Sequence, residues 1–232
     1  MPRFAADLAR ARPTEAALTD PDRTLGWAEV DDVLNRIANG LNARDLGPAR
    51  RVAVFAENAA ETALANLGGL VAGASVTPVN FHLNAEEAAY ILSSSGASVL
   101  FVDAATAARG LAAARLAGVE TVIGWRGVPA GAVDFETWLD AQSPAPCRED
   151  LPPLPNLLFT SGTTGRPKAV ELPPTMFAGG VTVAEHLTRL RDNPLADKGV
   201  HLVVGPMYHT GPLSGARLLA AGTPSVILGR FD

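Results

Sequence analysis

The stretch Asn156-Leu-Leu-Phe-Thr-Ser-Gly-Thr-Thr-Gly-Arg-Pro-Lys-Ala-Val170 decides the fold of this 232-residue chain. An apolar run over 157–159, typical of a buried strand, leads into six residues that are all Thr, Ser or Gly. Glycines let a backbone turn tightly and bring its N–H groups close to a ligand, while hydroxyls and Lys168 add donors and a positive charge. The pattern therefore predicts a loop that folds over a polyphosphate.

The residues after this loop distinguish it from other phosphate-binding loops. A Walker A loop needs Gly, four residues and then Gly-Lys-Ser/Thr, whereas here Lys168 follows Pro167 and precedes Ala169. The segment 169–174, Ala-Val-Glu-Leu-Pro-Pro, is typical of a short strand ended by prolines. We therefore expect the loop to join two strands. An ordinary Gly-rich hairpin turn is the alternative that these residues alone leave open.

Composition and charge exclude several classes of function. The apolar fraction of 47% is typical of a soluble globular protein that can bury a core. A net charge of −5 gives no electrostatic reason to expect nucleic acid or an anionic membrane as partner. The single cysteine, Cys147, excludes an intramolecular disulfide, which suits the reducing cytoplasm where we expect the protein. We expect neither a signal peptide in residues 1–15 nor an integral membrane segment in the uncharged residues 62–85, which Gly and Pro interrupt.

Helix and strand patterns alternate along the first half of the chain. Apolar runs predict strands at 51–56, 75–79, 98–102 and 119–123, with helical spacing between them at 30–41, 58–72, 84–96 and after 102. We expect Asn58 to cap the second of these helices, and Asn84 with Glu87 to form a capping box for the third, which Gly96 ends. Repeated β-α-β units imply an α/β fold, with a mainly parallel sheet flanked by helices on both faces.

A shift in composition between Ser143 and Pro155 suggests a boundary, because five prolines surround a charged triplet there. We predict an exposed linker at this point. The predicted parts are a first α/β subdomain over 1–142, a Pro-rich linker over 143–155 and a partial second α/β subdomain over 156–232. The elements expected after the phosphate loop are a helix over 175–190, a strand over 200–204, a helix over 213–221 and a strand over 225–228.

Other side chains are expected to have structural roles. Trp27 and Trp138 are predicted to anchor the core. The spacing of His82, His186 and His201 suggests no metal site. Four arginines flank the first helix and strand and are expected to be solvated: Arg36, Arg44, Arg50 and Arg51.

The glycine-rich stretch closely resembles the signature of the adenylate-forming superfamily, which includes acyl-CoA synthetases, peptide-synthetase adenylation domains and luciferases. That signature reads Tyr/Phe-Thr-Ser-Gly-Thr-Thr-Gly-x-Pro-Lys-Gly, and the one departure here is Ala169 in place of Gly. Further segments resemble family motifs in the family's order, and acyl-CoA synthetases most closely: 25–30, 51–58, 79–91, 206–211 and 219–232. The resemblance implies the N-terminal part of the family's large domain, truncated before the C-terminal domain.

The resemblance also implies a two-step reaction. A carboxylate attacks the α-phosphorus of ATP to give acyl-AMP and pyrophosphate, and the thiol of coenzyme A then displaces AMP. The implied ATP-binding residues are Thr160, Ser161, Gly162, Thr163, Thr164, Gly165 and Lys168, with Thr163 or Thr164 reaching Mg²⁺. The implied catalytic residue is His209, which binds the carboxylate together with Met207, Tyr208 and Gly211. Two alternatives stay open: Lys168 anchors the loop through an ion pair, and His209 is merely hydrogen-bonded in its loop.

The expected substrate is a fatty or other apolar carboxylate. The chain stops at Asp232, before the family's adenine-binding loop, ribose-binding aspartate and catalytic lysine. We therefore expect these residues alone to be inactive. Two other functions stay open: a non-catalytic folded module that binds at most phosphate or an acyl group, and an adenylation enzyme that loads a carrier protein instead of coenzyme A.

Overall fold

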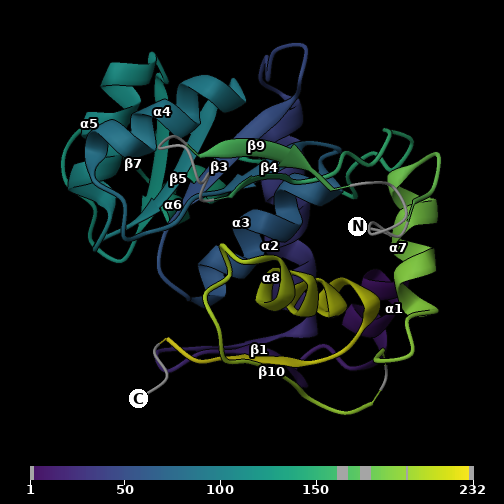
Figure 1. Ribbon diagram of the computed structural model, residues 1–232. Coiled ribbons are helices and arrows are strands. Elements are labelled where there is room, and N and C mark those ends of the chain that lie inside the picture. Colours follow the sequence, from purple (N-terminus) through teal and green to yellow (C-terminus); the bar gives the residue numbers. More distant parts are fainter. Residues whose placement is uncertain (1–2, 161–166, 173–178, 197, 230–232) are drawn as a thin grey trace.

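A computed structural model describes residues 3–160, 167–172, 179–196 and 198–229 (Figure 1). Its larger sheet has five parallel strands in the order β4-β3-β5-β6-β7. These are β3 (Arg51–Phe55), β4 (Ser75–Pro78), β5 (Val99–Asp103), β6 (Thr121–Trp125) and β7 (Val133–Asp134). The helices that accompany them are α2 (Trp27–Asn42), α3 (Ala60–Val71), α4 (Ala85–Ser95), α5 (Ala107–Ala117) and α6 (Phe135–Asp140).

Alternating side chains of the central strand divide the core between the two faces of this sheet. Val52 and Val54 pack with α2 and α3, whereas Ala53 and Phe55 pack with α4 and α5. Successive side chains of a strand point to opposite faces, so an uninterrupted apolar strand requires helices on both sides. The α/β fold predicted from the sequence is confirmed.

A second, mixed sheet joins strands from both ends of the chain. Its order is β10-β11-β1-β2, where β1 pairs parallel with β11 and antiparallel with β2. The strands are β1 (Ala16–Thr19), β2 (Thr24–Gly26), β10 (His201–Val203) and β11 (Ser225–Ile227). Figure 1 shows β1 and β10 below the larger sheet. The division into residues 1–142 and 156–232 stays a prediction, and this sheet takes strands from both ranges.

The predicted strand pair around the phosphate loop is a hairpin. Strands β8 (Leu157–Thr160) and β9 (Lys168–Glu171) are antiparallel, and Thr160 lies opposite Lys168. Strand β8 lies next to β4. The remaining elements are α1 (Arg3–Ala11), α7 (Val183–Arg191), α8 (Thr210–Ala216) and the 3₁₀ helix η2 (Arg217–Ala221).

Two helix starts differ from the sequence predictions. Residues 179–182 precede α7 and are not helical, since Gly179 and Gly180 have φ of 70° and 104° and Thr182 caps the helix. Residues 173–178 of that predicted helix lie outside the described residues. Helix α3 has Ala59 at its N-cap position, so the prediction that Asn58 caps it is wrong. The capping box of Asn84 and the left-handed Gly96 at the end of α4 are confirmed.

Three of the four arginines predicted to be solvated are half-buried instead. Arg50 donates to the carbonyl oxygens of Ala72 and Gly73, at 2.9 and 3.1 Å. Arg51 donates to the Ser95 carbonyl at 3.1 Å. Arg36 donates to the carbonyl of Leu139 in the last turn of α6 and to that of Gln142 just after it. Guanidinium groups offer five donors, which suits the open carbonyls at helix ends. Arg44 is exposed, and Trp27 and Trp138 are buried, as predicted.

The Pro-rich segment is held on α2, although most of its residues are exposed or half-buried. The amide of Asn39 donates to the carbonyls of Ser143 and Ala145, at 2.9 and 2.8 Å. Cys147 is buried in the core, where burial raises the pKa of its thiol. None of the helices in the described residues combines the length and hydropathy that a bilayer-spanning segment needs.

Candidate functional site

The open end of the β8–β9 hairpin carries the first and last of the predicted phosphate-binding residues. Thr160 ends β8, Lys168 begins β9, and both side chains are exposed. The hydroxyl of Tyr90 on α4 donates to the carbonyl of Pro167 at 3.3 Å, which holds the second arm of the hairpin. The exposed Lys168 lies at the base of the loop, and no ion pair of its side chain is found among the described residues. The predicted residues Ser161, Gly162, Thr163, Thr164 and Gly165 lie outside the described residues.

The predicted carboxylate-binding residues lie in the loop between β10 and α8. His209 is exposed and occupies the N-cap position of α8, and its amide donates to the Pro206 carbonyl at 3.0 Å. The ring of Tyr208 contacts the ring of His209, with centroids 4.2 Å apart. Tyr208 also packs edge to face with Phe81, which follows β4, with ring centroids 5.2 Å apart. Aromatic contacts of this geometry help fix the direction of both rings.

A cavity of about 220 Å³ brings the hairpin and the His209 loop together. Phe159 and Pro167 contribute the hairpin side, and Tyr208 and His209 contribute the loop side. The remaining lining residues are Pro78, Asn80, Leu83 and Ile91. The cavity lies beyond the carboxyl end of β4, where open α/β sheets bind their ligands. Apolar walls with a few polar groups at one end are suited to a small organic acid.

Two of the four predicted carboxylate-binding residues do not line this cavity. Met207 is buried in the hydrophobic core, and its amide donates to the side-chain oxygen of Asn58 at 2.9 Å. Gly211 is exposed on α8, with no atom within 4 Å of the position that a Cβ would occupy. Sequence reasoning did not assign Phe159 or Asn80 to the site. The signal for Asn80 was available, because the family-like segment 79–91 contains it.

A second cavity, of about 580 Å³, is larger but contains none of the predicted site residues. It lies between α1, the end of α7 and the turn before β11, with Trp27 among its lining residues. Its charged residues are of both signs: Asp7, Arg12, Glu15 and Arg191. A large volume alone does not indicate a binding site. The smaller cavity is the better candidate, because the predicted site residues Tyr208 and His209 line it.

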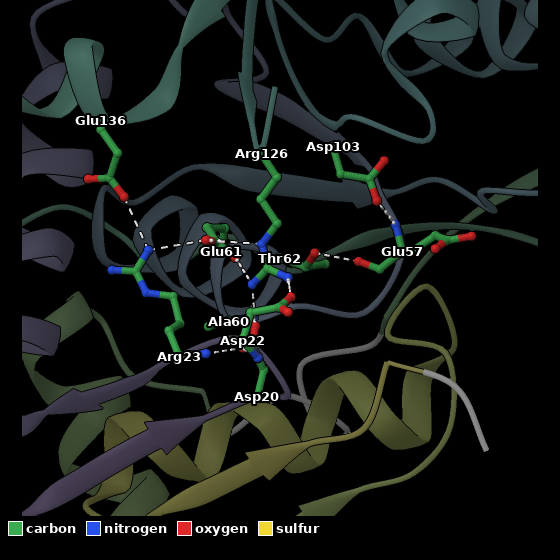
Figure 2. A network of polar contacts seen from close by, with 10 residues as sticks. All are labelled: Asp20, Asp22, Arg23, Glu57, Ala60, Glu61, Thr62, Asp103, Arg126 and Glu136. Carbon is green, nitrogen blue, oxygen red and sulfur yellow. Dashed lines mark hydrogen bonds and ion pairs between the residues drawn. The ribbon is translucent and has the colours of Figure 1, made fainter. Parts of the chain in front are cut away.

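A network of ion pairs joins the two sheets near the carboxyl ends of β5 and β6 (Figure 2). The buried carboxylates of Asp20 and Glu61 both accept from Arg126, and Glu61 also accepts from Arg23 at 3.1 Å. Burial alone would raise the pKa of Asp20, but backbone amides, that of Ala60 foremost, and the Arg126 guanidinium together lower it. Two buried anions are thus matched by two cations. This balance indicates a structural role.

Comparisons with known proteins agree with these features. The family model described as AMP-binding enzyme matches residues 5–232. The feruloyl-CoA synthase of an Amycolatopsis species is 31% identical over 97% of this chain and 43% of its own length. Phosphinothricin tripeptide synthetase PhsC of Streptomyces viridochromogenes is 33% identical over 72% of this chain and 15% of its own length.

Among solved structures, the inhibitor-bound N-terminal domain of FACL13 from Mycobacterium tuberculosis has a TM-score of 0.76 with 23% identity. The match covers 99% of this chain and 57% of that chain. At this identity the likeness concerns the fold, and it agrees with the N-terminal part of an adenylate-forming enzyme. The chain spans less than half of the curated relatives described above.

Proposed function

This chain belongs to the AMP-binding enzyme family, and we propose that it forms the ATP- and carboxylate-binding part of an AMP-forming acyl-CoA synthetase. The observation that carries the proposal is the cavity of about 220 Å³ between Tyr208, His209 and the hairpin. A small organic acid bound in this cavity would lie beside Thr160 and Lys168, the two ends of the loop that is rich in hydroxyl and amide donors. Adenylation must bring the carboxylate and the phosphates of ATP together.

The proposed reaction has two steps. A carboxylate oxygen attacks the α-phosphorus of ATP, the bond to the bridging oxygen breaks, and pyrophosphate leaves. The thiolate of coenzyme A then attacks the acyl carbonyl, and AMP leaves with the electron pair of the broken C–O bond. Negative charge grows on the β and γ phosphates in the first step only, because pyrophosphate has left before the second step begins. We propose that donors in the loop 160–165 and the ammonium group of Lys168 stabilise that charge.

His209 is proposed to bind the carboxylate. Its exposed ring lies at the edge of the cavity, against the ring of Tyr208, so it can reach an anion that enters from solvent. A neutral imidazole would orient the carboxylate by a hydrogen bond, and an imidazolium would pair with it. The apolar walls formed by Leu83, Ile91 and Phe159 would receive the acyl or aryl group. The proposed substrates are therefore apolar carboxylates, which include fatty acids.

Mg²⁺ is the proposed cofactor, and when bound it neutralises phosphate charge. Mg²⁺ in nucleotide sites commonly keeps several waters and binds through substrate phosphates with few protein ligands. Among the described residues, no group of three or more His, Cys, Asp or Glu could hold a metal ion. The hydroxyls of Thr163 and Thr164 are the proposed contacts from this chain. The cytoplasm, which supplies ATP and coenzyme A, is the proposed location.

The test is the carboxylate-dependent exchange of labelled pyrophosphate into ATP. The complete gene product and residues 1–232 alone would be assayed side by side with aryl, short aliphatic and long aliphatic acids. We expect exchange from the complete product with an apolar acid, and residues 1–232 alone serve as the comparison. No exchange by the folded complete product with any acid would contradict the proposal.

A carrier protein is the second candidate acceptor, favoured by the 33% identity to a peptide synthetase. The two acceptors differ only in the second step. Acyl-AMP that has been formed in place would be offered coenzyme A or a phosphopantetheine-bearing carrier protein. Formation of the coenzyme A thioester supports the synthetase, whereas acylation of the carrier alone supports the alternative.

A further inference from the structure

The side chain of Asn58 connects two parts of the chain that are far apart in sequence. Its amide nitrogen donates to the carbonyl oxygen of Gly205 at 2.8 Å and to that of Leu228 at 3.2 Å. Its oxygen accepts from the amide of Met207 at 2.9 Å. The amide group thus holds the loop before His209 and the end of β11 at the same time. An asparagine offers two donors and one carbonyl acceptor in one plane, and all three functions are used here.

Asn58 is itself held firmly on the larger sheet. The amide of the preceding Glu57 donates to the buried carboxylate of Asp103 at 2.9 Å, and Thr62 donates to the Glu57 carbonyl at 2.5 Å. Two residues further on, the amide of Ala60 donates to Asp20 at 2.8 Å. Figure 2 shows these bonds on both sides of the segment that leads from β3 into α3. Asn58 therefore extends from a fixed support.

The loop that Asn58 holds has few hydrogen bonds of its own. Within the loop between β10 and α8, the His209 amide donates a backbone hydrogen bond to the Pro206 carbonyl. Gly205 and Pro206 do not favour a regular element, because glycine has a flexible backbone and proline lacks an amide donor. Only one residue separates Met207 from His209, so a shift of the Met207 amide moves the histidine with it.

We propose that Asn58 is a positioning residue that sets where Tyr208 and His209 enter the cavity. The proposal rests on the proposed function, since it concerns the same carboxylate site. Asn58 does not line the cavity, so it acts through the loop backbone. A displacement of about 1 Å at a reacting group can lower a rate by about a hundredfold, so a support of this kind matters to the reaction.

The chemistry of the contact predicts which substitutions fail. Asn58→Ala removes all three bonds. Asn58→Asp keeps the acceptor for the Met207 amide but places a negative charge beside the carbonyl oxygens of Gly205 and Leu228, which then have no donor. We expect Asp to impair the site at least as much as Ala, although Asp is closer in shape to Asn. A residue needed only for its volume would give the opposite order.

The matched control is Asn39→Ala. Asn39 also donates its amide to two carbonyls of a loop, those of Ser143 and Ala145, but that loop does not border the cavity. In the active complete enzyme, we expect Asn58→Ala to raise KM for the carboxylate about tenfold or more while KM for ATP changes less than about twofold. Asn39→Ala is expected to change neither constant. Equal rises in both constants for Asn58→Ala would overturn the positioning role.

Amide exchange and NMR of residues 1–232 test the same inference without catalysis. In Asn58→Ala we expect faster exchange of the Met207 and His209 amides, by about tenfold or more, and altered ring shifts of His209. Residues in α4 would serve as an internal reference for the fold. Faster exchange at Met207 with an unchanged His209 would overturn the inference, because the loop would then hold its position without Asn58.

If Asn58→Ala does not fold, Asn58→Ser and Asn58→Asp are measured in the same way. An inactive wild-type enzyme would refute the proposed function, while the exchange data would still decide the role of Asn58.

Discussion

His186 makes a prediction about the dependence of stability on pH. Its side chain is fully buried on α7, and its Nδ1 lies 2.8 Å from the carbonyl oxygen of Gly179. Burial lowers the pKa of His186 from 6.5 to about 4, because the charged imidazolium loses its hydration. The hydrogen bond to Gly179 acts in the opposite direction, and the charges of Arg217 and Arg189 lower the pKa further.

The sign and size of the effect follow from this difference in pKa. Between pH 6.5 and about pH 4, His186 is protonated in the unfolded chain but neutral in the folded chain. The free energy of unfolding therefore falls as the pH falls. The contribution of His186 is complete above pH 6.5 and is lost down to about pH 4, where the loss ends. At 1.36 kcal/mol for each pKa unit, the whole loss is about 3 kcal/mol, of which about 2 kcal/mol has occurred at pH 5.

Urea unfolding followed by tryptophan fluorescence at pH 7, 6 and 5 would measure this loss. His186→Gln cannot titrate, so its free energy of unfolding should fall by about 2 kcal/mol less than wild type between pH 7 and 5. The exposed His82→Gln variant is the control and should follow wild type. Comparing variant with wild type cancels the effect of carboxyl groups such as Asp31, whose pKa burial raises. Parallel pH profiles for His186→Gln and wild type would refute the reasoning.

Three further predictions concern the ion pairs, the phosphate loop and the Pro-rich segment. Arg126→Ala should lower the free energy of unfolding by about 3 kcal/mol, because it leaves buried carboxylates short of a cation. Arg126→Gly should cost about 1 kcal/mol less than Arg126→Ala, since Arg126 has a φ of 61°, a conformation that glycine adopts without strain. Equal urea midpoints for the two variants would contradict this. In the complete enzyme, Thr163→Val with Thr164→Val should slow adenylate formation about a hundredfold in single-turnover assays and spare thioester formation from pre-made acyl-AMP. Equal slowing of both steps would mean that the loop is structural. Limited proteolysis followed by mass spectrometry should detect cleavage near the exposed Arg148 before cleavage within 51–102. The reverse order would show that the predicted boundary at 143–155 is wrong.

The features that the sequence predicted correctly depend on neighbours in the chain. The central strand β3 shows this, because its uninterrupted apolar run requires helices on both faces, and Val52 and Phe55 indeed face opposite sides. The capping box at Asn84 uses only residues within one turn, so its spacing was sufficient. The hairpin β8–β9 likewise follows from an apolar run, a Gly-rich turn and a short second strand.

The features that it missed depend on distant partners. Asn58 has the residue type and position of a helix cap, yet its amide binds Gly205 and Leu228, and Asp20 accepts from the start of α3 in its place. Arg50 and Arg51 resemble solvated charges, but the carbonyls that they reach belong to helix ends 22 or more residues away. A local pattern gives the donors and acceptors of a side chain. It does not say which distant carbonyls the fold brings near.

The loop around His209 shows the same limit within the site itself. An apolar Met207 beside Tyr208 and His209 suggests contact with an acyl group, but its side chain lies in the core and its amide is held by Asn58. Both ends of Met207 thus fix the loop, and the polar neighbours are left to face the cavity. Its assignment to the carboxylate site stays a prediction. Leu83 and Phe159 line the cavity, whereas Met207 does not. We therefore expect discrimination among apolar acids to depend first on Leu83 and Phe159.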